Sequence, residues 1–359
     1  MAYKVNNPDQ DAINLAKKVQ KAIETQKEWY SLKSLLGFGE PYSLFFLIGG
    51  REAGKSYAAL DFFLHEFFTK GKTFTWLRLT EASTRKMLQN NGLSFIDAGL
   101  MLKYNIDSRD LKTKGFWVFY KDKPMAKILA LSTFYNDKGV PLFEDKDFEG
   151  EVYSYNICLD EFQLEVGQKQ TLSIAYCFVQ QLENLVRHKT NVRCFIIGNA
   201  TQQASELLSL VNFIPEQFGR YKLKKKRTVI DYIPPSEKYI KRRSKSLPGI
   251  LMPDHSNFTN VMKYDRSKIY KGRLYKPQYI IQFRNNMFTV WDNNIVARHN
   301  KENKPVIAMV PLLIDNSVYK SELRDEIILM DYEKKFRFKD LITQKLFDRC
   351  IKEIKGVKG

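Results

Sequence analysis

A glycine-rich segment at residues 49–56 constrains this chain more than any other part of its sequence. The segment reads GGREAGKS and fits the pattern GxxxxGK[ST]. The apolar run at residues 42–48 predicts a buried strand before it, and the apolar spacing across residues 55–70 predicts a helix after it. Strand, glycine loop and helix in this order are typical of a phosphate-binding P-loop.

Each part of this segment has a physical reason to bind a nucleotide. The three glycines let backbone N–H groups approach phosphate oxygens, and the helix N-terminus adds partial positive charge at the same point. We expect Lys55 to reach the β- and γ-phosphates and the Ser56 hydroxyl to ligate Mg²⁺. The expected nucleotide-binding residues are Gly49, Gly50, Arg51, Glu52, Ala53, Gly54, Lys55, Ser56 and, from a later strand, Asn199.

A second strand-like run, residues 152–159, ends in the acidic pair Asp160–Glu161. An acidic pair at a strand end can be an ordinary solvated loop, but downstream of a P-loop it favours a Walker B motif. Asp160 is then expected to hold Mg²⁺, and Glu161 to polarise the water that attacks the γ-phosphate. An adjacent Glu is typical of NTP-hydrolysing motors. The guanine-reading pattern NKxD does not occur in the sequence, so ATP is preferred to GTP.

Two further apolar runs predict more strands of the same sheet. Residues 192–198 lead to Asn199, which we expect to sense the γ-phosphate between the P-loop and Walker B strands; the alternative is a turn asparagine. Residues 73–79 form another candidate strand, and residues 170–185 have helical spacing. Buried strands that alternate with helices predict an α/β fold with an open, mainly parallel sheet.

The charge of the chain is distributed unevenly. Residues 1–219 hold 26 Lys/Arg and 25 Asp/Glu, whereas residues 220–359 hold 32 and 15, so nearly all of the net +18 lies in the second part. A Pro-Pro pair at 234–235 breaks regular structure. We therefore predict a P-loop domain at 1–200, a linker at 201–235 and a basic C-terminal domain at 236–359. The basic excess indicates a polyanionic partner, nucleic acid first and an anionic membrane second; the alternative is a merely soluble, charged surface.

Other residue types exclude several classes of protein. The four cysteines lack CxxC spacing and are expected to be buried, reduced thiols rather than a disulfide framework. The four histidines lack metal-ligand spacing, which argues against a zinc site. No apolar run approaches the ~18 residues that span a bilayer. The first residues lack the apolar core of a signal peptide, so we expect a protein that is not secreted.

With the P-loop, Asp160-Glu161-Phe162 and Asn199-Ala200 in hand, the chain resembles the DNA-packaging motor ATPases of small podophages, the Picovirinae group. These are terminase-like members of the additional-strand, catalytic-glutamate (ASCE) class of P-loop NTPases. The resemblance is densest in residues 46–78, 155–162 and 185–213, and it is weak after residue 220.

The resemblance implies a homo-oligomeric ring, with five subunits as the expected number, mounted on the portal of a viral procapsid in the host cell cytoplasm. ATP hydrolysis in the ring drives double-stranded DNA inward. The resemblance also implies that Arg187 acts in trans on a neighbour's γ-phosphate, the alternative being a solvated surface arginine, and that Arg51 contacts phosphate in cis. The family has a further arginine where this chain has Lys189, which puts any role there in doubt.

For the C-terminal domain, the resemblance implies a smaller basic α/β or α+β unit, like ribonuclease H but without its cutting site, that docks on the portal and in some members on a structural RNA. Asp292 closes a strand-like run at residues 288–291, and Asp254, Asp265 and Asp315 are isolated in the sequence. Without an evident cluster of carboxylates, an inactive docking domain is favoured over a two-metal nuclease. DNA contacts should be directed to phosphates, because packaging accepts any sequence. The candidates lie in the insert between the early strands of the P-loop domain and the Walker B strand, where the aromatic residues at 116–120 predict a hairpin strand: Lys103, Lys112, Lys114, Lys121 and Lys123.

The leading hypothesis is an ATP-driven translocase of double-stranded DNA that packages a viral genome. Glu161, Lys55 and Arg187 are its candidate catalytic residues, and Ser56 and Asp160 its candidate metal ligands. One alternative is another nucleic-acid-stimulated P-loop ATPase of helicase or transposition type, although no second set of helicase motifs is evident. The other is a basic nucleic-acid-binding scaffold with a non-hydrolysing P-loop, against which Glu161 argues.

Overall fold

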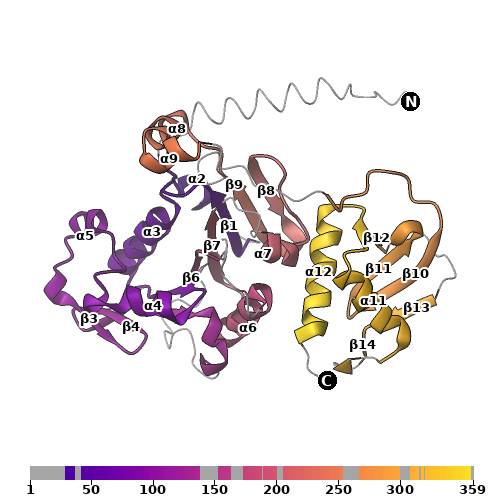
Figure 1. The fold of residues 1–359 in the computed structure, drawn as a ribbon. Helices are drawn as coiled ribbons and strands as arrows, with labels where there is room; N and C mark the ends of the chain where they lie inside the picture. The colour runs from indigo at the N-terminus through magenta and orange to yellow at the C-terminus, as the bar shows by residue number, and fades with distance from the viewer. Residues whose placement is uncertain are drawn as a thin grey trace, which may run out of the picture. The chain divides into compact units, whose positions relative to one another are not determined.

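The computed structural model describes residues 29–36, 42–137, 153–162, 173–187, 189–199, 205–253, 267–299, 308–314, 317–318 and 320–356 (Figure 1). The chain divides into two compact units. Met1–Ala204 and Pro215–Lys263 form the first, which we call the P-loop unit, and Ser205–Ile214 and Tyr264–Gly359 form the second unit.

The P-loop unit is built on one sheet, in which nine strands are described. They are β1 (Leu44–Gly49), β2 (Phe74–Arg78), β3 (Leu111–Lys114), β4 (Trp117–Tyr120), β5 (Lys123–Ala130), β6 (Tyr155–Asp160), β7 (Val192–Asn199), β8 (Gly219–Leu223) and β9 (Thr228–Tyr232). Their order is β3-β4-β5-β2-β6-β7-β1-β9-β8. The run from β5 to β9 is parallel, and β3, β4 and β8 are antiparallel. The predicted mainly parallel sheet is confirmed, and β7 lies between β6 and β1 as expected.

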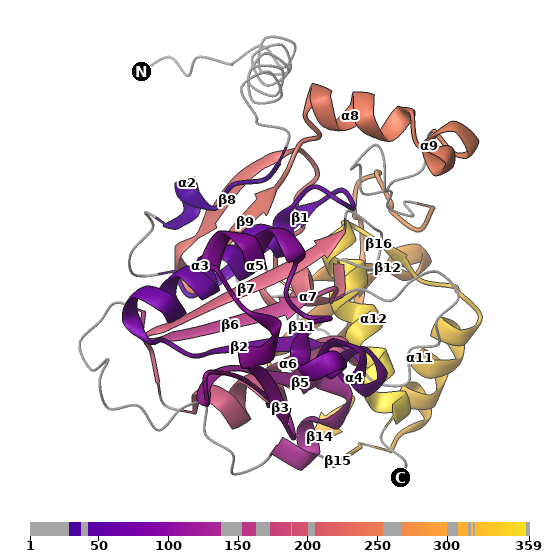
Figure 2. The same cartoon turned by 90° about the vertical axis from the view of Figure 1, so that its left-hand side faces the viewer.

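The P-loop unit also contains helices. They are α2 (Lys33–Leu36), α3 (Lys55–Lys70), α4 (Glu81–Leu88), α5 (Ala98–Tyr104), α6 (Ile174–Val186), α8 (Glu237–Ser244) and α9 (Leu247–Leu251). Of these, α3 to α6 lie between strands of the sheet, α2 precedes β1, and α8 and α9 follow β9. The predicted helix after the P-loop is confirmed as α3. It ends at Gly71, whose left-handed backbone (φ 77°) lets the N–H groups of Gly71 and Lys72 cap the carbonyls of Phe67 and Glu66. The helix lies over the sheet face formed by β6 and β7 (Figure 2).

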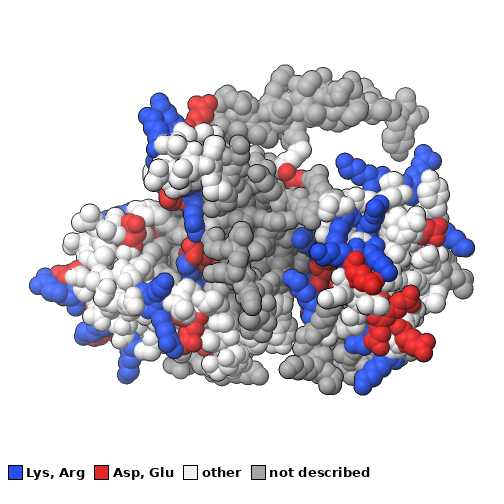
Figure 3. Space-filling model, in the orientation of Figure 1, with Lys and Arg blue, Asp and Glu red and all other residues white. Residues whose placement is uncertain are grey.

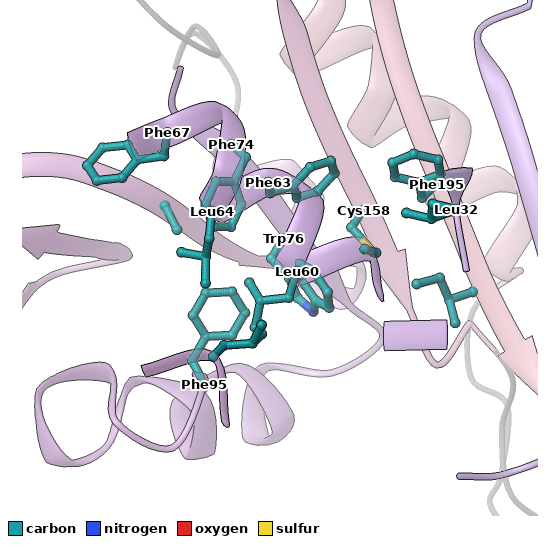
Figure 4. Close-up of a cluster of buried hydrophobic side chains, with 14 of the residues drawn as sticks. Leu32, Leu60, Phe63, Leu64, Phe67, Phe74, Trp76, Phe95, Cys158 and Phe195 are labelled. Atoms are coloured by element: carbon teal, nitrogen blue, oxygen red, sulfur yellow. The ribbon is translucent and has the colours of Figure 1, made fainter. Parts of the chain in front are cut away.

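An aromatic core fixes α3 against the sheet. The Phe63 ring, which is fully buried, lies 5.1 Å from that of Phe74 and 5.6 Å from that of Phe195, measured between centroids (Figure 4). Trp76 and Phe95 continue the cluster, with ring centroids 5.3 Å apart. Each buried side chain of this size contributes about 1.5–3 kcal/mol of transfer free energy. The helix that follows the P-loop is therefore held rigidly against β2 and β7.

The segment that we expected to be a linker contributes to the sheet. β9 pairs in parallel with β1, and β8 forms a hairpin with β9, so residues 219–232 extend the P-loop sheet. Residues 220–263, with 12 Lys/Arg and 3 Asp/Glu, belong to the P-loop unit. The prediction that separates the P-loop domain from the basic part of the chain therefore differs from the structure, because half of the net positive charge of the chain lies in this segment.

The second unit contains a smaller mixed sheet. Its elements are α7 (Ser205–Leu210), β10 (Pro277–Phe283), β11 (Asn286–Trp291), β12 (Ile295–Arg298), β13 (Ala308–Pro311), β14 (Leu313–Ile314), β15 (Ser317–Val318), α11 (Glu322–Tyr332), β16 (Arg337–Phe338) and α12 (Leu341–Gly356). The main sheet has the order β13-β10-β11-β12-β16. The Phe347 ring of α12 packs 5.5 Å from Phe288 and 5.1 Å from Phe336. This agrees with the expected small α/β or α+β unit; its likeness to ribonuclease H stays a prediction.

The remaining sequence expectations concern cysteines, metals and membranes. All four cysteines are buried and free. Within the described residues, no group of three or more His, Cys, Asp or Glu side chains is placed to hold a metal ion. Of the isolated aspartates, Asp254, Asp265 and Asp315 lie outside the described residues. No helix in the described parts of the chain has the length and apolar character needed to cross a membrane.

Candidate active site

The P-loop connects β1 to α3 through a backbone that exposes its N–H groups. β1 ends at Gly49 and α3 begins at Lys55. Glu52 (φ 60°) and Gly54 (φ 86°) adopt left-handed conformations. Because a left-handed residue within a turn makes successive N–H groups converge, the loop forms a concave anion-binding surface at the start of α3.

Lys55 is folded back onto this loop. Its Nζ donates to the carbonyl oxygens of Gly50 at 2.5 Å and Gly49 at 3.3 Å, and only 5% of the residue is exposed. Burial lowers the pKa of Lys55 to about 8, and the charges of Asp160 and Glu161 oppose that shift. A phosphate would add a stronger acceptor and further negative charge at this ammonium, so the geometry favours anion binding.

Ser56 and Asp160 bring two oxygen ligands together. The Ser56 hydroxyl donates to Oδ1 of Asp160 at 2.8 Å. Burial raises the pKa of Asp160, and the charge of Arg78 and the bond from Ser56 oppose that rise. A hydroxyl and a carboxylate are the oxygen donors that Mg²⁺ binds in nucleotide sites. These two residues therefore fit a magnesium ion.

The turn after β6 directs Glu161 toward the same place. Glu161 has a left-handed backbone (φ 52°), and its side chain is 55% exposed. The next residue, Phe162, is buried beneath Gly198 of β7, where an added Cβ would lie 2.3 Å from the Phe162 ring. The glycine thus makes room for the ring that anchors this turn.

Arg78 was not among the predicted site residues, and the structure bonds it to both carboxylates of the acidic pair. Its Nη1 donates to Oδ2 of Asp160 at 3.0 Å, and its Nη2 forms a short hydrogen bond with Oε2 of Glu161. Arg78 is the last residue of β2, which pairs in parallel with β6. The only local sign of a role for Arg78 was a charged residue at the end of an apolar strand. That its partners are Asp160 and Glu161 follows only from the pairing of β2 with β6.

A pocket of about 230 Å³ gathers most of the predicted nucleotide site. Asn199 ends β7 opposite Gly49 in the register of β1 and β7, which brings it beside the P-loop. The lining residues are Arg51, Glu52, Ala53, Gly54, Lys55, Ser56, Tyr57, Asp160, Glu161, Ile197, Gly198 and Asn199. Residues from the ends of β6 and β7, the P-loop and the first turn of α3 therefore meet at the carboxyl edge of the sheet.

Arg187 does not join them. It is an exposed residue at the end of α6, with φ 52°. Two residues later, Lys189 donates to the hydroxyl of Tyr155 at 2.7 Å, and Tyr155 begins β6. Five residues of strand, or ~16 Å, separate that end of β6 from Asp160. Arg187 thus lies toward the edge of the sheet opposite to its own nucleotide pocket.

Arg51 and Glu52 connect the P-loop to α8. Arg51 is exposed, and its carbonyl accepts a hydrogen bond from the Tyr239 hydroxyl at 2.8 Å. The Glu52 carboxylate accepts one from Nη1 of Arg243 at 2.5 Å. Both contacts come from a helix more than 180 residues downstream in the sequence.

Three of the five lysines proposed to contact DNA have acidic partners. Lys103 contacts Asp61 at 2.6 Å, Lys112 contacts Asp122 at 2.9 Å, and Lys121 lies 3.6 Å from Asp110. Lys112, Lys114, Lys121 and Lys123 are exposed on the predicted hairpin, which is confirmed as β3 and β4 leading into β5. Acidic side chains stand beside basic ones at this end of the molecule (Figure 3). Their role with DNA stays a prediction.

A family model described as Podovirus DNA encapsidation protein (Gp16) matches residues 27–297. The chain belongs to this family. That match spans the P-loop, the Walker B pair, Asn199 and the β8–β9 hairpin, so the family assignment and the site rest on the same part of the chain. Among curated proteins, no sequence matches this one.

Two solved structures share the fold of this family member. The Phi-28 gp11 DNA packaging motor has a TM-score of 0.65 at 13% identity, with 93% of this chain and 99% of that chain covered. A chain of the bacteriophage Phi-29 viral genome packaging motor assembly has a TM-score of 0.59 at 16% identity, with 91% and 100% covered. The similarity extends over both units, and at these identities it shows the fold.

Proposed function

We propose that this podovirus encapsidation protein hydrolyses ATP and uses the energy to translocate double-stranded DNA into a procapsid. The convergence of Lys55, Ser56, Asp160, Glu161 and Asn199 on one pocket carries the proposal. Family membership and the fold shared with two phage packaging motors support it. ATP and Mg²⁺ are the proposed substrate and cofactor.

The residues of the pocket have distinct tasks in this proposal. Lys55 exchanges its carbonyl partners for β- and γ-phosphate oxygens, and Ser56 and Asp160 hold Mg²⁺. Mg²⁺, when bound, neutralises phosphate charge. Glu161 accepts a proton from the attacking water while a P–O bond forms to the γ-phosphorus and the bond to the ADP oxygen breaks. Because Arg78 binds the Glu161 carboxylate, that contact must open before Glu161 can act as the base.

The position of Arg187 supports a role in a neighbouring subunit. An exposed guanidinium far from its own pocket can complete only another subunit's site, where it would stabilise charge on the transferring phosphoryl group. We propose a homo-oligomeric ring, with five subunits as the expected number, on the portal of a procapsid in the host cytoplasm. A structural RNA and the second unit's docking role belong to the same proposal.

The test is steady-state ATP hydrolysis by the full chain across protein concentrations, with and without double-stranded DNA. Wild type should show a faster than linear rise with concentration and stimulation by DNA. Glu161→Gln should bind ATP and lose at least ~100-fold in turnover, since a general base contributes 10²–10⁴. Turnover that survives this change would refute the catalytic assignment.

Mixing experiments separate the ring from an isolated ATPase. An excess of Arg187→Ala should inhibit wild-type subunits, because each defective arginine faces a competent neighbour. Arg109→Ala is the matched control, since Arg109 is an exposed arginine paired with the nearby Asp107. ATP hydrolysis that rises linearly with protein concentration, and that changes neither with DNA nor with added Arg187→Ala, would be consistent with an ATPase but would refute the proposed ring motor.

A further inference from the structure

A second, larger cavity adjoins the phosphate pocket. Its volume is about 880 Å³, which suits a small-molecule site, and it shares Glu52, Gly54 and Tyr57 with the phosphate pocket. The N-terminal segment before β1, the first turns of α3, α5 and Arg242 of α8 form its walls. A molecule bound at the P-loop can therefore extend directly into this space.

The polarity of the phosphate pocket decides which end of a nucleotide would enter the cavity. The γ-phosphate end is marked by Asp160, Glu161 and Asn199, and none of these lines the larger cavity. A different cavity, of about 850 Å³, is lined by Ser56, Arg78 and Asp160 and so lies on the metal side. Glu52 and Gly54 line the larger cavity and the phosphate pocket but not this metal-side cavity. The cavity that begins at Glu52 and Gly54 is thus the one open to the ribose and base.

The indole of Trp29 gives this cavity a stacking surface. An added Cβ on Gly54 would lie 3.4 Å from Cε3 of Trp29, so the ring lies directly beside the P-loop. The neighbouring Tyr30 N–H donates to the Ala53 carbonyl at 2.8 Å, which fixes this segment to the loop. Trp29 nevertheless remains 51% exposed.

Arg242 supplies a second planar group at the same place. Its Cζ lies 4.4 Å from the centre of the Trp29 ring, and its Nη2 donates to the Glu52 carbonyl at 3.0 Å. The guanidinium is thus oriented by the P-loop itself. Indole and guanidinium planes are the groups on which nucleic-acid bases stack, with little dependence on base identity.

We propose that the base of the bound nucleotide stacks in this cavity against the Trp29–Arg242 pair. The proposal rests on the proposed function, since it places the base of the same ATP whose phosphates occupy the P-loop. It assigns to α8, a helix in the sequence between the P-loop sheet and the second unit, one wall of the nucleotide site.

Paired ligands test the proposal on the full chain. ATP reports on the whole site, whereas inorganic tripolyphosphate reports on the P-loop alone. Trp29→Ala should weaken ATP binding by ~10-fold or more, because stacking on an aromatic side chain is worth 1–3 kcal/mol per base. Tripolyphosphate affinity should stay unchanged. Trp29→Phe should retain most of the ATP affinity, and Phe116→Ala, which removes an exposed aromatic ring from the β3–β4 turn, should change neither.

The outcomes distinguish this site from the proposed function. Normal tripolyphosphate binding with an ATP affinity independent of Trp29 would overturn the base site alone. Equal losses for both ligands in Trp29→Ala would make Trp29 a support of the P-loop fold and would also overturn it. Failure of the wild-type chain to bind either ligand would overturn the P-loop assignment and, with it, the base site.

Discussion

The Ser56 hydroxyl and the Asp160 carboxylate are joined by a hydrogen bond of 2.8 Å, although 104 residues separate them in the sequence. The bond connects the first turn of α3 to the last residue of β6. Both elements are fixed by the buried core beneath them, so the two oxygens are held close together before any metal arrives. Preorganisation of this kind reduces the cost of binding Mg²⁺ in the required geometry.

Removing the Ser56 hydroxyl should therefore impair metal-dependent turnover. We expect Ser56→Ala to lower kcat by ~100-fold, about 2.7 kcal/mol of transition-state stabilisation, with stability little changed. Ser56→Thr is the matched control, since it keeps the hydroxyl and should keep activity at raised Mg²⁺ concentration. ATP turnover titrated with Mg²⁺ measures both. Equal activity of the Ala and Thr variants would show that the hydroxyl is not a ligand.

Arg78 should set the pH range in which Asp160 binds metal. Burial raises the pKa of Asp160, and the charge of Arg78 opposes that rise. Without the guanidinium, the pKa of Asp160 should rise further. As the pH is lowered, the Arg78→Met variant should therefore lose its Mg²⁺ affinity at a higher pH than the wild type does. Mn²⁺ or Mg²⁺ binding measured from pH 5 to 8 gives the midpoint. Arg85→Met, which removes an exposed α4 arginine paired with Glu81, should leave the midpoint unchanged.

Part of the site could be predicted from the sequence, and part of it could not. Ser56 and Asp160 each lie within a short local motif. Because the strand before each motif, β1 or β6, is apolar and was expected to be buried in one sheet, their convergence could be predicted. The partners of Arg78 depend on the pairing of β2 with β6, across 82 residues, which no local pattern encodes. The proposed role of Trp29 likewise follows only from its packing beside Gly54, which the sequence does not reveal.

The β8–β9 hairpin shows why the domain boundary was harder to predict. Residues 220–227 are dominated by lysine and arginine, and this change in charge, with the Pro-Pro pair at 234–235, led us to predict a linker. In β8, however, exposed Arg220 and Lys222 alternate with the less exposed Tyr221 and Leu223, as expected for an edge strand. Its partner β9 is buried throughout and adds directly to β1. The high content of lysine and arginine hid the alternation of exposed and less exposed residues along β8. The pairing of β8 with β9 in the structure reveals it.

Nucleotide binding near pH 8 should be accompanied by proton uptake at Lys55. Burial lowers the pKa of this ammonium to about 8, so a substantial fraction is neutral at that pH in the free protein. Phosphate charge favours the protonated form and raises the pKa, which requires uptake of part of a proton on binding. Calorimetry in buffers of different ionisation enthalpy measures the number of protons taken up per nucleotide bound. Uptake above that of Lys55→Arg, which stays charged at this pH, supports the assignment; equal values would contradict it.

The close contact between Gly198 and Phe162 predicts that a single methyl group disrupts the catalytic turn. An added Cβ would lie 2.3 Å from the Phe162 ring, so Gly198→Ala must displace the ring and, through the chain, Glu161. We expect a loss of about 1–3 kcal/mol in the free energy of unfolding, the range for overpacked cores, and a clear drop in ATP turnover. Thermal or urea unfolding and steady-state hydrolysis measure the two effects. Phe162→Leu should recover part of the stability when combined with Gly198→Ala, because the smaller side chain vacates the space. Additive losses in the double variant would show that the two positions do not share this contact.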